Sequence, residues 1–254
     1  MITRRFTLLG LAVLGGTLFV GAAPALAADT QIAVAANFTE PAKAIAAAFK
    51  AKTGHTATLS FGASGQFYAQ MAHGAPYEVF LSADADRPKA AEQAGLAVAG
   101  TRYAYAFGRL VLYSKTPGLV DAKGAVLKSD RFAKLAIADP ATAPYGAAAV
   151  QTMRKLGVYD ALAPRIVRGS SITQAYQYVA TGNAELGFVA LSQVIDQPGG
   201  SRWLVPANNH APIEQQAILL KTGQKNPAAR AFLVFLRSPA AIAIIRRYGY
   251  EVRR

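Results

Sequence analysis

Hydroxyl and amide side chains stand at four places where an expected strand gives way to an expected helix. The four junctions contain Asn37, the Ser64–Gly65 pair, and residues 139–146 and 169–172. The start of a helix presents unpaired backbone N–H groups and a partial positive charge, which together can bind an anion without any cation. At any single junction a helix N-cap is the simpler interpretation, since Asn, Ser and Asp are preferred caps. Four junctions, two in each half of the chain, favour a shared crevice at the carboxyl ends of parallel strands.

Residue types suited to catalysis or metal binding are scarce. The chain has no cysteine, which excludes disulfides, thiolate metal sites and a cysteine nucleophile. Its histidines, His55, His73 and His210, are not at metal-ligand spacing, and no paired-carboxylate or P-loop motif is present. The stretch from Gly62 to Gly65 does not match the G-x-S-x-G nucleophile elbow. We therefore expect no enzyme activity, no bound metal cation and no cofactor; a secreted α/β hydrolase is the alternative from another functional class.

The N-terminal 27 residues have the form of a secretory signal. Arg4 and Arg5 give a positive start, an apolar stretch follows, and Ala25 and Ala27 supply the small residues of a cleavage site. We expect residues 1–27 to be removed on export to the periplasm, by the general or the twin-arginine route. An uncleaved membrane anchor is the alternative, although the apolar stretch is at the short end of what crosses a bilayer.

Composition and charge limit the class of protein. The 254 residues allow one large or two small domains, and a chain that is 52% hydrophobic and 16% charged is not disordered. The formal net charge of +13 invites a nucleic-acid interpretation. The basic residues are scattered, however, and no arginine-rich run or zinc-finger spacing is present. We expect no nucleic-acid partner, and we expect the positive charge to attract a small anion over long range.

Short apolar runs alternate with helical patterns along the chain. Strands are expected at residues 31–35, 56–61, 79–82, 135–138, 186–189 and 203–205. Helices are expected from residue 42 to a stop at Gly54, at 67–72, 87–94, 146–156 and 172–180, and after the N-caps Asn226 and Ser238. This alternation predicts βαβ units and parallel sheets.

The alternation of strands and helices is interrupted by two long extended runs, residues 103–114 and 214–221. They predict two α/β lobes joined by two crossovers, a hinge that could close around a ligand. The expected parts are residues 28–104 with 216–254 for lobe I, and 105–215 for lobe II. One large doubly wound sheet with long edge strands is the alternative.

Several motifs occur in order along the exported part of the chain. They are residues 34–38 (VAANF), 61–66 (FGASGQ), 74–84 (GAPYEVFLSAD), 138–140 (ADP), 144–146 (PYG), 187–193 (GFVALSQ) and 247–250 (RYGY). In these motifs the sequence resembles the periplasmic molybdate-binding proteins of ABC importers. The resemblance implies an α/β, two-lobe periplasmic-binding-protein type II fold with a double-crossover hinge. It also implies that molybdate or tungstate is held between the lobes, that a membrane permease is the partner, and that the protein is a monomer.

The same resemblance implies a set of ligand-binding residues. In the first lobe the oxyanion donors fall on Asn37 and on Ser64, through its hydroxyl and backbone N–H. In the second lobe they fall on the hydroxyl of Tyr145 and the backbone N–H of Ile172. The chain departs from many relatives, which have Ser in place of Asn37 and a donor Tyr in place of Ala190. A binding protein for sulfate, phosphate or another oxyanion is the close alternative, and an interaction protein whose junctions are only caps is the third.

Overall fold

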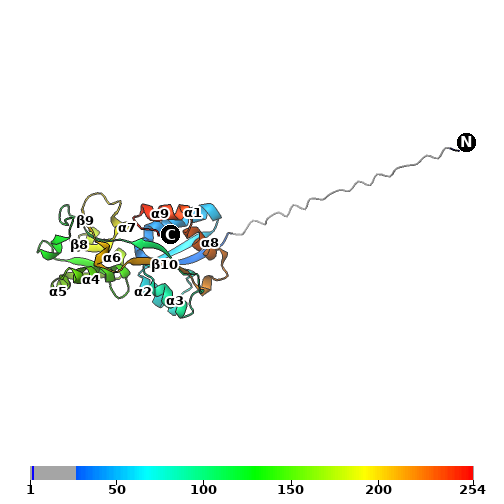
Figure 1. Cartoon of the computed structure of the whole chain (residues 1–254), viewed down its shortest axis with the longest axis horizontal. Helices are drawn as coiled ribbons and strands as arrows, with labels where there is room; N and C mark the ends of the chain where they lie inside the picture. Colours follow the sequence, from blue (N-terminus) through cyan, green and yellow to red (C-terminus); the bar gives the residue numbers. More distant parts are fainter. Residues whose placement is uncertain (1, 3–26, 254) are drawn as a thin grey trace.

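The computed structural model describes residue 2 and residues 27–253. The chain forms two α/β lobes that lie side by side (Figure 1). Lobe I is built on a five-stranded sheet with the order β2-β1-β3-β10-β4, and lobe II on a five-stranded sheet with the order β7-β6-β8-β5-β9. The two-lobe prediction is confirmed, and the single doubly wound sheet is wrong. The predicted signal peptide, residues 1–27, lies almost entirely outside the described residues.

Lobe I holds both the start and the end of the described chain. Its strands are β1 (Asp29–Ala35), β2 (Thr56–Gly62), β3 (Val79–Leu81), β4 (Tyr103–Gly108) and β10 (Ile213–Leu219). Its helical segments are η1 (Ala36–Phe38), α1 (Thr39–Thr53), α2 (Ser64–Ala72), α3 (Asp86–Gln93), η5 (Lys221–Gly223), α8 (Pro227–Leu236) and α9 (Pro239–Arg247). Strands β1, β2 and β3 are parallel, as predicted, whereas β10 is antiparallel to both β3 and β4.

Lobe II is the middle part of the chain. Its strands are β5 (Leu110–Ser114), β6 (Leu135–Ala138), β7 (Ile166–Gly169), β8 (Leu186–Ala190) and β9 (Ser201–Leu204). Its helical segments are η2 (Ala125–Lys128), α4 (Pro144–Lys155), α5 (Tyr159–Leu162), η3 (Ala163–Arg165), α6 (Ile172–Ala180), α7 (Leu191–Val194) and η4 (Ala207–Asn209). Strand β6 is parallel to β7 and β8, and β5 is antiparallel to β8 and β9. The sequence did not predict β7, because this short edge strand carries the exposed Arg168 and shows no buried apolar run.

The two crossovers lie a few residues from their expected positions. The extended run 103–114 is two strands in different sheets, separated at Arg109, and the chain returns to lobe I between Leu204 and Ile213. Residues 105–108 and 213–215, assigned above to lobe II, therefore pair within the sheet of lobe I. The pattern could not place the first crossover because β5 follows β4 with only Arg109 between them, so the two strands look like one extended run.

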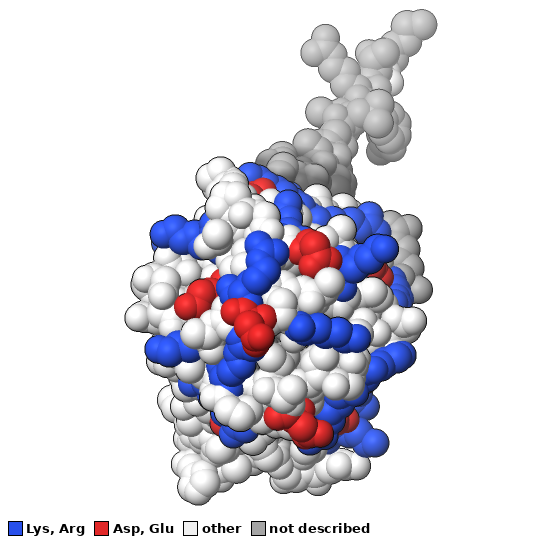
Figure 2. Space-filling view, turned by 90° about the vertical axis from the view of Figure 1, so that its left-hand side faces the viewer, with Lys and Arg blue, Asp and Glu red and all other residues white. Residues whose placement is uncertain are grey.

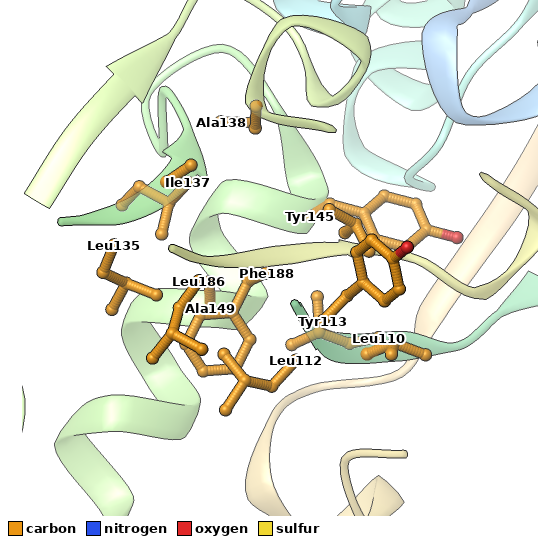
Figure 3. Close-up of a cluster of buried hydrophobic side chains, with 14 of the residues drawn as sticks. Leu110, Leu112, Tyr113, Leu135, Ile137, Ala138, Tyr145, Ala149, Leu186 and Phe188 are labelled. Atoms are coloured by element: carbon orange, nitrogen blue, oxygen red, sulfur yellow. The ribbon is translucent and has the colours of Figure 1, made fainter. Parts of the chain in front are cut away.

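Each lobe has its own hydrophobic core. On lobe I, the alternation of side chains along β1 places Ile32 and Val34 in a cluster on one face of the sheet and Ala33 in a cluster on the other. Lobe II has one large core, around Leu112, Leu135 and Phe188 (Figure 3). Tyr145 lies at the edge of this core, so its ring is fixed by apolar packing.

Charged side chains of both signs cover the outer end of lobe II. Figure 2 shows Lys and Arg interspersed with Asp and Glu on that face rather than one continuous basic patch. Among the described residues no single helix is both long and apolar enough to span a membrane. Helices α8 and α9 pass that test only when joined, and they are bent by 62° at the break between them.

Candidate anion-binding site

All four residues that the resemblance implied line one small cavity between the lobes. Its wall consists of Ala35, Ala36, Asn37, Gly62, Ala63, Ser64 and Ala83 from lobe I, and Ala143, Pro144, Tyr145 and Ile172 from lobe II. None of these residues carries a charged side chain. The cavity volume is about 10 Å³, close to the room that one water molecule needs. Any larger anion therefore enters only when the lobes separate.

A larger groove of about 440 Å³ lies beside this cavity and shares Ala36 and Asn37 with it. The carboxylates of Glu40 and Asp196 line the groove. Because these like charges repel an anion, the groove is the less suitable of the two sites for one.

The four residues that the resemblance implied, Asn37, Ser64, Tyr145 and Ile172, lie at the beginnings of helical segments. Ser64 and Ile172 are the first residues of α2 and α6, and Asn37 and Tyr145 are the second residues of η1 and α4. The first N–H groups of a helix have no partner inside that helix. Together with the positive ends of the helix dipoles, these groups direct partial positive charge toward the cavity from both lobes.

The caps of these helices differ from those expected. Neither Asn37 nor Ser64 is an N-cap, because the N-cap positions of η1 and α2 are Ala35 and Ala63. The N-cap of α4 is also an alanine, Ala143. Alanine has no polar atom to occupy the free N–H groups. Three of the helical starts at the cavity thus have no side-chain cap, although in α2 the N–H of Gly65 donates to the backbone carbonyl of Thr142.

Side chains cap helices elsewhere. Asn226 caps α8 and Ser238 caps α9, and neither residue lines the cavity, so the N-cap predictions there are confirmed. Of the junction residues, Ser171 is an N-cap: its hydroxyl oxygen accepts from the N–H of Gln174 at 3.3 Å. The cap interpretation is therefore right for α6 and wrong for Asn37 and Ser64.

The hydroxyl of Ser64 is held in place by the loop after β3. Its oxygen accepts a hydrogen bond from the backbone N–H of Ala83 at 2.9 Å, and the side chain is buried. Within the described chain no acceptor takes the hydroxyl hydrogen of Ser64. Ser64 can therefore offer both its O–H and its backbone N–H to an anion in the cavity.

The hydroxyl of Tyr145 reaches from α4 to the crossover strand β10. Its oxygen accepts a long hydrogen bond of 3.5 Å from Nε2 of Gln215. The tyrosine is 1% exposed, and burial raises its pKa well above the usual range, so the phenol stays protonated. Since its oxygen accepts from Gln215, its hydrogen can turn to the neighbouring hydroxyl of Tyr250 or to an anion in the adjacent cavity.

The side chain of Asn37 is already engaged. Its Nδ2 donates to Oε1 of Gln215 at 3.0 Å and to the hydroxyl of Tyr250 at 2.9 Å. Its backbone carbonyl accepts from the hydroxyls of Ser192, at 2.8 Å, and Tyr250, at 2.7 Å. In this arrangement Asn37 can give an anion its backbone N–H, and its amide side chain holds the segment in place.

Sequence reasoning missed the polar network behind the cavity. Gln215 and Tyr105 join Asn37 to the crossover strands, because the hydroxyl of Tyr105 donates to Oε1 of Gln215 at 2.9 Å. Tyr250 belongs to the motif at residues 247–250, but no function was assigned to that motif from the sequence. The available signal was a run of three polar residues, Glu214, Gln215 and Gln216, inside a strand whose other residues are apolar.

Hydrogen bonds across the cleft hold the lobes together around the cavity. The N–H of Gly65 in lobe I donates to the carbonyl of Thr142 in lobe II at 2.9 Å. The Arg87 guanidinium donates to the carbonyl of Ala141 at 2.9 Å and also pairs with Asp84. Arg87 is thus a cleft-rim residue whose charge is balanced within its own lobe, and it does not line the cavity.

The described residues offer no catalytic group beside Ser64. Neither a histidine nor a carboxylate lines the cavity, and no group of three or more His, Cys, Asp or Glu residues in the described chain could hold a metal ion. Two of the histidines make local contacts: His73 with the carbonyl of Ala69, and His210 with that of Ala211. A serine nucleophile needs an adjacent base, which this cavity does not supply.

The buried phenols predict a pH dependence of stability. Burial raises the pKa of Tyr250 to about 12, whereas a tyrosine in an unfolded chain has a pKa of about 10. The stabilisation from neutral Tyr250 is complete below pH 10 and is lost as the pH rises toward 12, because the unfolded chain releases its proton first. Urea unfolding of the wild type and of Tyr250→Phe should give free energies whose difference shrinks by roughly 2 kcal/mol over that range.

A matched control for that experiment is Tyr178→Phe, because this half-buried tyrosine lies outside the network. The dependence of its free energy of unfolding on pH sets the baseline for the comparison. A Tyr250→Phe difference that follows that baseline from pH 9 to 12 would contradict the assigned role of burial.

Comparison with known proteins places most of the chain in one family. Residues 30–251 match the family model described as bacterial extracellular solute-binding protein. The chain is 60% identical over 229 residues to the molybdate-binding protein ModA of Rhodobacter capsulatus, with 90% of each protein covered. It is 53% identical over 235 residues to the protein of the same name from Azotobacter vinelandii, with 91% of this chain and 93% of the relative covered.

A solved structure agrees with this grouping. The periplasmic molybdate-binding protein of Azotobacter vinelandii superposes with a TM-score of 0.86 and 41% identity, covering 89% of this chain and all of that one. The sulfate-binding protein SubI of Mycobacterium tuberculosis, at 15% identity and a TM-score of 0.74, shares the fold.

Proposed function

The chain belongs to the bacterial extracellular solute-binding proteins and, within them, to the molybdate-binding proteins; from this premise we propose that it holds molybdate in the small cavity between its lobes. It is the substrate-binding protein of an ABC transporter and not an enzyme. The proposed donors are the backbone N–H groups of Asn37, Ser64 and Ile172 and the hydroxyls of Ser64 and Tyr145.

One observation carries the site assignment: helical starts from both lobes converge on a single cavity without charged side chains. A tetrahedral dianion loses much of its hydration on entering such a site, and neutral N–H and O–H dipoles can replace it. Neutral donors also let the anion leave again. We propose that the lobes, residues 28–108 with 213–254 and residues 109–212, open to admit the anion and close on it.

The same chemistry discriminates among oxyanions. Phosphate carries a proton at neutral pH and needs an acceptor for it, and the cavity wall contains no carboxylate. Sulfate matches molybdate in charge and shape but is smaller, so it would contact fewer of the donors at once. Tungstate matches molybdate in charge, shape and size. We therefore propose that the protein binds molybdate and tungstate and discriminates against sulfate and phosphate.

Isothermal titration calorimetry of the exported protein with the four anions tests this proposal. We expect one site per chain for molybdate and for tungstate, with sulfate and phosphate at least a hundredfold weaker. Tighter binding of sulfate or phosphate than of molybdate would leave the fold assignment unchanged but would show that the ligand is a different oxyanion. Binding of none of the four would contradict the proposed function.

We also propose that the protein is exported and that residues 1–27 are cleaved. The first contacts of the described domain begin at Ala28, whose N–H donates to Nδ1 of His55 at 3.1 Å and whose carbonyl accepts from Thr56 at 3.0 Å. Cleavage before Ala28 would leave these contacts intact. Intact-mass measurement of the periplasmic protein should give a chain that begins at Ala28, and a chain that retains residues 1–27 would contradict the cleavage.

Delivery to the membrane completes the proposed function. We propose that the closed, loaded form docks as a monomer on the permease of an ABC importer. Stimulation of transporter ATPase activity in proteoliposomes should require both the protein and molybdate. Equal stimulation without molybdate would contradict recognition of the loaded form, and sedimentation as a dimer would contradict the monomer.

A further inference from the structure

A fully buried glutamine lies on β10, the strand on which the chain re-enters lobe I after the second crossover. Gln215 has no exposed surface, although its strand β10 is otherwise largely apolar. The pairing of β10 with β4 shifts register between Gln215 and Gln216, which marks a β-bulge. Bulges often re-aim a side chain at a functional site. A buried amide destabilises the fold unless its polar atoms are satisfied, so its partners should explain its presence.

The partners of Gln215 include one cavity residue from each lobe. Its Oε1 accepts from Nδ2 of Asn37 at 3.0 Å and from the hydroxyl of Tyr105 at 2.9 Å. Its Nε2 donates to the hydroxyl oxygen of Tyr145 at 3.5 Å. One side chain on the crossover thus contacts both Asn37 of lobe I and Tyr145 of lobe II.

The chemistry of an amide fixes the direction of these hydrogen bonds. Because Nε2 has only hydrogens to give, the oxygen of Tyr145 must accept in this contact, and the Tyr145 hydrogen stays available for an anion in the cavity. Because Oε1 can only accept, it draws an N–H of Asn37 and fixes that side chain. A carboxylate in place of the amide would instead accept the Tyr145 hydrogen and remove it from the cavity.

The glycine at the other crossover makes room for this contact. A Cβ on Gly108 would lie 2.1 Å from the hydroxyl oxygen of Tyr145 and 2.9 Å from Nε2 of Gln215. The φ of Gly108 is not positive, so its backbone conformation does not require glycine. The space at Gly108 does require it, because any side chain would push Tyr145 and Gln215 away.

We propose that Gln215 is a positioning residue of the oxyanion site: from β10 it orients the hydroxyl of Tyr145 in lobe II toward the anion and fixes the side chain of Asn37 in its own lobe I. This inference rests on the proposed function of the cavity. Gln215 itself does not line the cavity and does not touch the ligand. Its role is to make the donors of the two lobes act together when the lobes are closed.

The substitution Gln215→Glu tests this role, because a glutamate is the same size and can be switched by pH. At pH 8 its carboxylate would accept the Tyr145 hydrogen and repel the anion, so molybdate should bind at least tenfold more weakly than to the wild type. Toward pH 5.5 the carboxyl becomes protonated and can donate again, so the loss should shrink. The wild-type affinity should stay constant across this range.

No other group around Gln215 obscures that pH profile. The titratable groups that face it are the phenols of Tyr105, Tyr145 and Tyr250, whose pKa values burial raises far above the range tested. The Asp84 carboxylate is the charged group that acts on Tyr105, and it is present in every variant.

The neighbouring glutamine provides the matched control. Gln216 is also buried, but its Oε1 accepts from Arg102 and its Nε2 donates to Glu214, away from the cavity residues. Gln216→Glu should therefore bind molybdate as the wild type does at every pH. A pH-dependent loss with Gln215→Glu alone supports the inference, and wild-type affinity in Gln215→Glu at pH 8, or the same pH dependence in Gln216→Glu, overturns it.

A second variant covers the case in which Gln215→Glu does not fold. Gln215→Met keeps the length of the side chain without its polar atoms and should weaken molybdate binding about tenfold at all pH values. A folded Gln215→Met with wild-type affinity overturns the inference. If the wild type binds sulfate or phosphate in place of molybdate, the same comparison is made with that anion, which separates an error in the cargo from an error in the role of Gln215.

Discussion

Replacing Ala63 with aspartate is expected to abolish molybdate binding while leaving the protein folded. Ala63 is the N-cap of α2, in the extended conformation typical of caps, and Gln66 already accepts from its backbone N–H at 3.3 Å. An aspartate there would complete a capping box, and such a change from alanine adds about 0.5–2 kcal/mol to helix stability.

The same aspartate would prevent molybdate binding. Ala63 lines the cavity, so the new carboxylate would occupy the helix N–H groups and place a negative charge next to the anion. Two unit charges 4 Å apart near a protein surface interact by about 4 kcal/mol, and a dianion doubles the repulsion. We expect more than about a thousandfold loss of affinity in calorimetry, in a protein that still unfolds cooperatively on heating.

The neutral variant Ala63→Asn separates the two effects. Asparagine caps the helix equally well but adds no charge, so its loss of affinity should be smaller than that of Ala63→Asp. Wild-type binding by Ala63→Asp would mean that the anion is held somewhere other than at the start of α2.

Removing the hydroxyl of Ser64 should produce the second large loss of molybdate affinity. A hydrogen bond to a charged group contributes about 1.5–3 kcal/mol, so Ser64→Ala should bind molybdate roughly 10- to 150-fold more weakly. The variant also leaves the N–H of Ala83 without its acceptor, so a decrease in melting temperature should accompany the loss. Tyr145→Phe removes one donor in the same way, but it leaves the α2 contacts in place.

Matched controls exist for both residues. Ser170→Ala changes an exposed serine at a strand–helix junction that does not line the cavity, and Tyr178→Phe changes a tyrosine of lobe II outside the network. Both should bind molybdate as the wild type does. If Ser64→Ala and Tyr145→Phe also retained that affinity, the donor assignment would be wrong.

Most of the fold could be predicted because its helices and strands show hydrophobic periodicity and its helices begin and end at typical capping residues. The helix that begins near residue 42 ends at Gly54, whose φ of +76° forms the left-handed C-cap, and the N-caps of α8 and α9 are at Asn226 and Ser238. The strand β7 and the crossovers could not be placed. Strand pairing is non-local, and an extended run such as residues 103–114 looks the same whether its two ends join one sheet or two.

The candidate site was only partly accessible to sequence reasoning. The junction pattern drew attention to Asn37 and Ser64 and favoured a shared crevice, but at a single junction it could not separate an anion donor from an N-cap, because capping and anion binding use the same residue types. The alanine N-caps carried the opposite information, since Ala63 and Ala143 leave the helix donors free. Gln215 escaped notice because its partners lie more than a hundred residues away from it or in the opposite lobe.

Anomalous diffraction at the molybdenum absorption edge, from crystals grown with molybdate, tests the central claim most directly. We predict one strong peak per chain in the cavity between the start of α2 and the start of α6, within hydrogen-bonding reach of Ser64, Tyr145 and Ile172. A molybdenum peak outside this cavity, with the cavity itself free of molybdenum, would contradict the account.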